Sequence, residues 1–533
     1  MVYLGSNTLS YHSCCLCLCP CTMSSAVRQI VQNTGWLYAK MGITMFISLL
    51  VTRLILQSLG ASDFGIYNVV GGSISMLSFI SGSLASASTR FMAYAEGQGD
   101  QQRKVVIFNV CVTLHYAIAT LMMLVFTLAS FIFFGGVLNI PPERMTAAYV
   151  VYGSMVVGLF FSITRVPYDA VLNAHERMKF YAIVGVMESV LKLLVALACV
   201  YTSKDKLIVY GILMAVIPIA VNIVTRVYCK QHFSECLFQP RTYWDKSAMK
   251  EMLTFAFWVF CASISSVVSF YGSGIVLNHF FGTILNAAYG IATQLNGQLM
   301  AFSNNMHKAV IPVITKSEGS GQREVMIYRS TVASKYSYLI LAVLAIPFML
   351  EMDFILKVWL KEIPQWTVMF AQLVLIQSLI GLLTSTYVVS LEAEGNISLF
   401  NRVRSVFSIV PIILLIIVFM QGAPPIMLCV IRIIWNGILG ACIIIYFMKR
   451  NCGMNYGTFF RLALQPVMAV TLLSLLLGGV PVVLMEPSLF RLTLTVTMSL
   501  LGFGVSFWFL AIQENERIMI KGLLQQVRKR IKL

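Results

Sequence analysis

The sequence predicts an all-α integral membrane protein with about fourteen membrane-spanning helices. Of its 533 residues, 58% are hydrophobic and only 11% are charged, whereas soluble domains have roughly 45–50% and 25%. The apolar residues also gather in long runs of about 20 residues, the length that a helix needs to cross a bilayer. Strands of a membrane barrel would need only about 9–11 alternating residues each, so the long runs argue against that architecture.

The predicted spans follow one another closely along the chain. They cover residues 36–57, 64–86, 105–134, 146–168, 180–201, 207–228, 252–274, 285–310, 330–350, 367–391, 401–420, 424–447, 462–485 and 489–511. The second and the eighth of these are the least apolar.

The charge of the connecting loops predicts the orientation. Most of the 38 Lys and Arg residues fall in alternate connections and in the C-terminal segment. The opposite connections hold only Arg144, Lys204, Lys206, Lys357, Lys361 and Arg491. Because basic loops stay on the cytoplasmic side, we expect a multi-pass protein of the inner (plasma) membrane with both termini in the cytoplasm. The same rule explains the net charge of +17 without nucleic acid as a partner.

A short sequence pattern that occurs twice, called the echo below, divides the first twelve spans into two sets of six. Gly60 begins a segment that ends on Tyr67, and Gly282 begins a matching segment that ends on Tyr289. Each segment stands between the first two spans of a six-span block, and parallel duplication of six helices is one known transporter plan. The predicted parts are an N-lobe at 23–228, a cytoplasmic linker at 229–251, a C-lobe at 252–447 and two further spans at 448–511.

The two ends of the chain differ from the spans. Residues 1–22 contain five of the 13 cysteines and no Lys or Arg, and we interpret them as a non-native or disordered extension ahead of a start at Met23. Residues 512–533 predict a basic amphipathic helix on anionic membrane lipids in the cytoplasm. A solvated, frayed tail is the alternative for this last segment.

Basic residues inside the spans predict an anion-binding cavity. A charge at the centre of a span costs about 2.5–3.5 kcal/mol, so it needs a partner or a wet cavity. Six basic residues fall within the spans and Arg90 lies just beyond one. The predicted ligands of an anionic group are Lys40, Arg53, Arg90, Arg165, Lys335 and Arg432.

Structural explanations stay open for several of these charges. Glu188 and Lys192 are four residues apart, so they share a helix face and are predicted to form an ion pair. Lys40 and Lys335 could instead extend their ammonium groups to the headgroups. Arg53 could do the same on the opposite side, or pair with Asp63.

The eighth span carries a stripe of amides. Gln294, Gln298 and Asn305 follow the spacing of one helix face. Amides suit sugar hydroxyls and water better than lipid, so we predict sugar contacts here. Close helix packing is the alternative explanation for the polar residues of both the second and the eighth span.

The sequence lacks the patterns of an enzyme. Its six histidines are dispersed without an HExxH motif, and no GxxxxGK[ST] phosphate loop occurs. We therefore predict a transporter without its own ATPase, and we expect neither a metal nor a cofactor.

Residues 52–67, TRLILQSLGASDFGIY, resemble the first-loop signature of Wzx-type polysaccharide flippases. These belong to the multidrug/oligosaccharidyl-lipid/polysaccharide exporter (MOP) superfamily. The likeness extends over the chain from Met23, with spans arranged as six, six and two. It implies two six-helix lobes in a V that move undecaprenyl-pyrophosphate-linked oligosaccharide to the outer leaflet by alternating access, for surface polysaccharides such as lipopolysaccharide. Arg53 matches the family's first-span arginine, whereas the other arginines match no family motif.

The resemblance leaves other functions open. A lipid II-type flippase would take a chemically similar substrate. A drug/cation antiporter of the same fold would need a buried acid, which the first span lacks. A glycan polymerase or ligase usually has a large external loop, and a scaffold of a glycan-assembly complex would not transport. The expected partners are lipid-linked oligosaccharide, anionic lipids, and a polymerase and other glycan-assembly proteins.

Overall fold

A computed structural model describes residues 20–75, 79–134, 141–360, 363–513 and 517. All elements in these ranges are helices. Of the predicted extension at 1–22, residues 1–19 lie outside the described ranges. Most of the predicted tail at 512–533 also lies outside them. Both therefore stay predictions.

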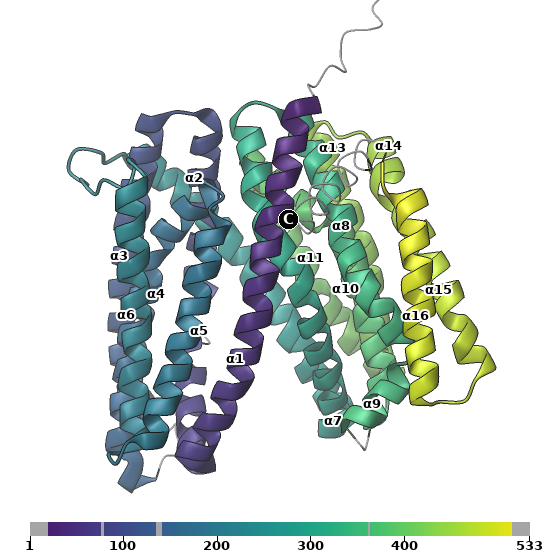
Figure 1. The fold of residues 1–533 in the computed structure, drawn as a ribbon, viewed down its shortest axis with the longest axis horizontal. Coiled ribbons are helices and arrows are strands. Elements are labelled where there is room, and N and C mark those ends of the chain that lie inside the picture. Colours follow the sequence, from purple (N-terminus) through teal and green to yellow (C-terminus); the bar gives the residue numbers. More distant parts are fainter. Residues whose placement is uncertain (1–19, 76–78, 135–140, 361–362, 514–516, 518–533) are drawn as a thin grey trace, which may run out of the picture.

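The first half of the chain forms six long helices and one short turn. They are α1 (Pro20–Ser75), α2 (Phe79–Gln98), α3 (Gln101–Ile132), η2 (Pro142–Arg144), α4 (Met145–Ala174), α5 (Met178–Tyr201) and α6 (Lys206–His232). They pack together as the N-lobe (Figure 1).

The second half begins with the longest helix. Its elements are α7 (Lys246–Gly319), α8 (Arg323–Leu350), α9 (Met352–Leu360), α10 (Thr367–Glu394), α11 (Ser398–Met420), α12 (Met427–Arg432), η3 (Ile433–Leu439), α13 (Gly440–Cys452), α14 (Tyr456–Phe459), η4 (Phe460–Leu464), α15 (Gln465–Leu484), α16 (Leu489–Ser506) and η5 (Phe507–Ala511). The elements α7 to α13 make the C-lobe, and α15 and α16 pack on α8 at its side (Figure 1).

The predicted all-α membrane fold is confirmed. Twelve stretches of the described residues are long and apolar enough to cross a membrane. The two predicted spans missing from these twelve are the polar ones at 64–86 and 285–310. The second of these lies within α7, and the first falls on α1, α2 and the undescribed residues 76–78. The count of fourteen therefore stays a prediction.

Two glycines occupy equivalent places in the two lobes. Gly60 (φ 74°, ψ 170°) interrupts α1, and Gly282 (φ 81°, ψ −176°) interrupts α7. Backbone of this kind is essentially restricted to glycine. These are the residues at which the sequence echo begins, so the echo marks a shared bend between two helices.

We expect Gly60→Ala and Gly282→Ala each to destabilise the protein by about 1–3 kcal/mol, because an added Cβ strains this backbone. Thermal unfolding in detergent measures the change. Gly290→Ala is the matched control, since Gly290 lies within α7 with nothing within 4 Å of an added Cβ. Equal stability of the Gly290 and Gly282 variants would contradict the strain argument.

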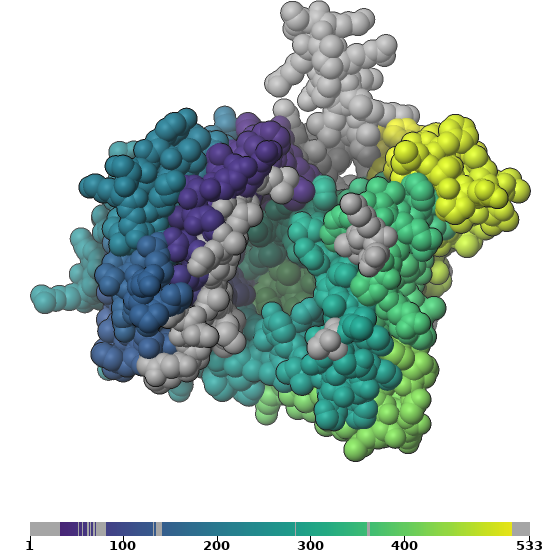
Figure 2. Space-filling model, turned by 90° about the horizontal axis from the view of Figure 1, so that it is seen from below, coloured from purple at the N-terminus to yellow at the C-terminus, as the bar shows by residue number. Residues whose placement is uncertain are grey.

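The two ends of the molecule differ in charge and in closure. The end where α2 is joined to α3 and α7 to α8, uppermost in Figure 1, is here called the basic end, and the opposite end the far end. Arg103, Lys104, Lys316 and Arg323 lie at the ends of these helices. The lobes touch at the basic end, where Lys316 of α7 lies 3.0 Å from Glu176 of the N-lobe. Seen from the far end, the molecule is hollowed between the N-lobe and the C-lobe (Figure 2). The structure is thus closed at the basic end and open at the far end.

Buried polar contacts fix α15 and α16 to the C-lobe. Arg491 Nη2 lies 2.7 Å from Glu351 Oε2, and the Thr495 hydroxyl donates to Glu351 Oε1 at 2.8 Å. In addition, Lys335 Nζ of α8 donates to the Ala511 carbonyl at 2.9 Å. The added helices are therefore integral to the C-lobe rather than loosely appended.

Candidate functional site

A cluster of charges lies inside the N-lobe where α1, α4 and α5 meet. Arg165 Nε is 3.0 Å from Asp169 Oδ2, and Arg165 Nη1 is 3.8 Å from Glu188 Oε2. Lys192 Nζ lies 2.8 Å from Glu188 Oε1. Lys40 of α1 lies 4.3 Å above the ring of Tyr181 and within electrostatic reach of both carboxylates. We call Lys40, Arg165, Asp169, Glu188 and Lys192 the N-lobe charge cluster.

The N-lobe charge cluster carries a positive excess. Its three cations face two carboxylates, and Lys308 of α7 adds a further positive charge near Lys40. The ion pairs stabilise the cations inside a lobe where an isolated charge would be costly. The remaining charge attracts an anion rather than a cation.

A cavity of about 500 Å³ adjoins this cluster. It lies between α1, α5 and α7. Its lining is Met41, Thr44, Met45, Ile47, Ser48 and Val51 of α1, Ser189 and Lys192 of α5, and Gln298, Leu299, Ala301 and Phe302 of α7. Lys192 belongs to both the cluster and the cavity wall, so the cavity joins the charges of the N-lobe to the C-lobe.

The predicted amide stripe reaches this cavity in part. Gln298 lines it, and Gln294 is an exposed residue one turn earlier on α7. Asn305 instead contacts α1, where its Nδ2 lies 2.9 Å from Met41 Sδ. The stripe thus faces α1 and the cavity rather than packing uniformly within the C-lobe.

Two predicted anion ligands are engaged elsewhere, which corrects the sequence interpretation. Lys335 is fully buried and donates to Ala511 O, so it anchors η5 instead of lining the cavity. Arg90 is also buried, and donates to the Glu392 and Ala393 carbonyls at 2.9 and 3.0 Å. In this state Arg90 ties the N-lobe to the C-lobe at the basic end.

Arg165 departs from the prediction in a different way. It lies in the N-lobe interior as expected, but Asp169 and Glu188 occupy its guanidinium. Asp169 lies at the end of a predicted span, and its pairing with Arg165 was not predicted. The signal was available, because Asp169 follows Arg165 by four residues, the same spacing that pointed to Glu188 and Lys192.

Arg432 keeps unused donor capacity. Its Nε lies 3.4 Å from Gln377 Oε1 and its guanidinium lies 5.7 Å from the Phe270 ring centre. Its Nη1 is buried without a hydrogen-bond partner among the described residues. A buried N–H without an acceptor is unfavourable, so this arginine is suited to an incoming anion.

Arg53 is exposed, and no ion pair to it occurs within the described ranges. The predicted alternative of an Arg53–Asp63 pair is wrong, because Asp63 pairs with Arg144. Arg53 follows the cavity-lining Val51 by two residues, which is about 200° around a helix. Its side chain therefore projects away from the cavity between α1, α5 and α7.

Comparison with known families matches residues 30–318 to the polysaccharide biosynthesis protein family. The chain belongs to this family. No curated protein matches the sequence significantly.

Solved structures share the fold at low sequence identity. A MATE in complex with MaD3S has a TM-score of 0.69 and 11% identity, over 80% of this chain and 96% of that one. An outward-facing multidrug resistance MATE family transporter of the MOP superfamily has a TM-score of 0.68 and 12% identity, over 80% of this chain and 96% of that one. A MOP superfamily transporter from Pyrococcus furiosus has a TM-score of 0.66 and 11% identity, over 80% of this chain and 96% of that one. This member of the polysaccharide biosynthesis family therefore shares its fold with these solved transporters.

Proposed function

We propose that the protein moves an anionic lipid-linked oligosaccharide, of the undecaprenyl-pyrophosphate type, from the cytoplasmic to the outer leaflet of the inner membrane. The basic end is its cytoplasmic end. The observation that carries this proposal is the mainly apolar cavity bordered by a positively charged cluster. An amphipathic anion matches both parts of that surface.

The chemistry of the site fits each part of such a substrate. A pyrophosphate cannot cross hydrocarbon unaided, and guanidinium groups bind phosphate oxygens with paired hydrogen bonds. Lys192 supplies positive charge at the cavity wall. Arg432, on α12 of the C-lobe and outside that lining, keeps a buried N–H without a partner among the described residues. Gln298 offers an amide to sugar hydroxyls, while Val51 and Phe302 offer apolar contact to the lipid part.

The closed basic end and the hollow far end support transport by alternating access. The hollow opens at the far end (Figure 2), and contacts of Lys316 and Arg90 join the lobes at the basic end. Rocking the lobes about the cavity would open the basic end, as in other transporters with repeated halves. The contacts of Arg90 and Lys316 would then have to break.

Drug/cation antiport is the second candidate, and one observation favours it. Asp169 and Glu188 are the interior acids that such a protein needs, although they lie on α4 and α5 rather than on α1. Both acids already have cationic partners, and the cluster is positive as a whole. We therefore rank anion transport above cation transport. A lipid II-type substrate would use the same groups.

We expect Arg432→Ala to lower flipping of a defined undecaprenyl-pyrophosphate glycan in proteoliposomes at least tenfold, because roughly 1.5–3 kcal/mol of charged hydrogen bonding is lost. Arg53→Ala tests the family's first-span arginine in the same assay. Arg450→Ala, an exposed arginine on α13, is the control and should flip at the normal rate.

The assay also tests the function itself. The proposal is rejected in favour of antiport if the intact protein flips neither the glycan nor lipid II and instead exports an organic cation in exchange for protons. Normal flipping by both Arg432→Ala and Arg53→Ala would leave the transport proposal standing and reject these two arginines as ligands.

A further inference from the structure

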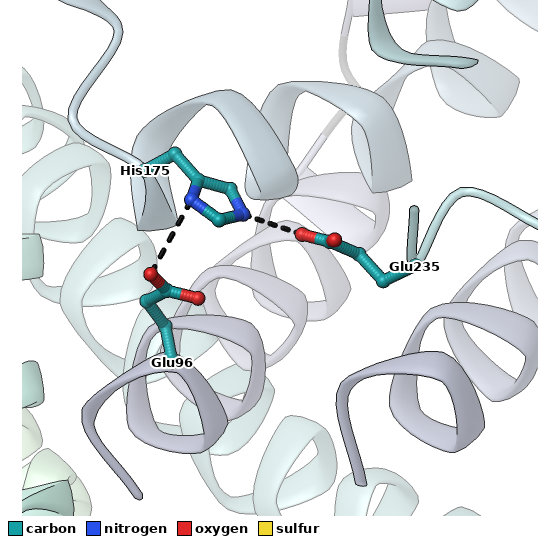
Figure 3. A group of neighbouring side chains, drawn as sticks. All are labelled: Glu96, His175 and Glu235. Atoms are coloured by element: carbon teal, nitrogen blue, oxygen red, sulfur yellow. Dashed lines mark hydrogen bonds and ion pairs between the residues drawn. The ribbon is translucent and has the colours of Figure 1, made fainter. Parts of the chain in front are cut away.

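A histidine lies between two carboxylates at the basic end of the N-lobe (Figure 3). His175, just after α4, places Nδ1 3.3 Å from Glu96 Oε1 of α2, and its Nε2 contacts Glu235 in the loop after α6. The ring also stacks on Phe233, with centroids 4.3 Å apart. Three separate elements therefore meet on one imidazole.

The protonation state of the imidazole decides whether both contacts hold. A neutral imidazole has one N–H, so its other nitrogen would turn a lone pair toward a carboxylate. An imidazolium donates from both nitrogens. It also balances the charge, because Glu96 and Glu235 then face His175 and Lys104, whose Nζ lies 2.9 Å from Glu96 Oε2.

The residues that follow Glu96 and His175 form the contact between the lobes. Gly97 packs so closely on the Lys316 carbonyl that an added Cβ would lie 2.3 Å from it. Glu176 Oε1 is 3.0 Å from Lys316 Nζ. Both chain segments that receive Lys316 are therefore held together by the imidazole.

Other charged or titratable groups around the ring come from every neighbouring element. They are Lys104 of α3, Glu176 after α4, Cys229 of α6, Cys236 beside Glu235, and Lys316 of α7. Burial raises the pKa of Glu235, but hydrogen bonds from His175 and its own backbone outweigh burial, so this pKa lies below its ordinary value. A lowered carboxyl pKa means that the contact is lost only as the pH falls through that value. Above it Glu235 stays charged, and the number of N–H donors on the imidazole then decides whether both carboxylates are held.

We propose that His175 is a proton-binding site that controls closure of the basic end. Protonated His175 bridges Glu96 and Glu235 and holds the N-lobe surface that receives Lys316. Loss of the proton releases one carboxylate and loosens that surface. This inference rests on the proposed function only in treating closure as one state of alternating access.

A divalent metal is the competing occupant of the site. One donor atom from each of Glu96, His175 and Glu235 lies within 4.8 Å of the others. However, the two carboxylates flank opposite edges of the ring (Figure 3), and the Lys104 ammonium already binds Glu96. That ammonium would repel a divalent cation at the same carboxylate, so the geometry favours a proton.

Hydrogen exchange of the purified full chain in detergent tests the proposal. We expect amides of residues 90–98 and 315–322 to be about tenfold better protected at pH 5.5 than at pH 8, after correction for intrinsic exchange. His175→Gln should remove this pH dependence. His175→Arg, which keeps its charge at both pH values, should stay protected at both.

Controls make the result decisive. His232→Gln, at an exposed histidine on α6, should respond to pH as the unmodified protein does. If His175→Gln does not fold, Glu96→Gln removes the same bridge. Unchanged protection across pH, or a pH response that survives both substitutions, overturns the proposal. The proposal is also overturned if, at constant pH, amide protection rises on addition of Zn²⁺ and falls on addition of EDTA. The readout needs no substrate, so absent flipping with an intact pH response would reject only the transport function.

Discussion

Gly97→Ala is expected to keep the basic end from closing and to lower flipping at least tenfold. The Gly97 Cβ would lie 2.3 Å from Lys316 O, and a Cβ on Gly319 would lie 2.2 Å from Tyr94 O. The two backbones thus touch reciprocally, and neither obstacle is a flexible side chain that could move aside. A penalty of only about 1.4 kcal/mol on the closed state already changes its population tenfold.

Two measurements check this prediction. Flipping of the lipid-linked glycan reports the loss of function, and hydrogen exchange of residues 315–322 reports the loss of closure. Gly381→Ala on α10 is the matched control, because nothing lies within 4 Å of its added Cβ. A Gly97→Ala protein that flips normally would show that this close approach is not needed in the transport cycle.

Local patterns in the sequence were sufficient to predict the fold class and to mark the two glycine bends. Long apolar runs give helices that a bilayer can bury, whatever lies beside them. The echo of Gly60 and Gly282 was visible because a bend of this kind demands glycine at both positions. The Glu188–Lys192 spacing was visible for a similar reason, since side chains four residues apart meet on any helix.

The site was harder to predict because its contacts join residues that are distant in the sequence. Arg90 and Lys335 looked like unpaired cations in isolation. Their acceptors are backbone carbonyls 302 and 176 residues away. Backbone acceptors have no sequence signature, so composition alone overstated the number of free positive charges. The His175 site was not predicted because its carboxylate partners lie on two other elements, distant in the sequence.

We expect Glu351→Ala to destabilise the packing of α15 and α16 on the C-lobe by about 3–5 kcal/mol, the usual cost of leaving a buried charge without its partner. The Glu351 side chain is fully buried, and it accepts from both Arg491 and Thr495. After the substitution, Arg491 would retain the Met485 carbonyl at 3.1 Å. Stepwise thermal unfolding in detergent, with proteolysis between α15 and α16, measures the effect. Lys357→Ala, which breaks an exposed pair with Asp353, is the control and should change stability by less than about 1 kcal/mol.

A double substitution of Glu351 and Arg491 by leucine separates anchoring from transport. Replacing a buried ion pair with apolar residues is often neutral or stabilising, so this protein should regain the stability that Glu351→Ala loses. If it also flips the glycan normally, the pair serves only to attach α15 and α16. Recovered stability without flipping would instead show that transport requires the charges themselves, and failure to recover stability would contradict the anchoring argument.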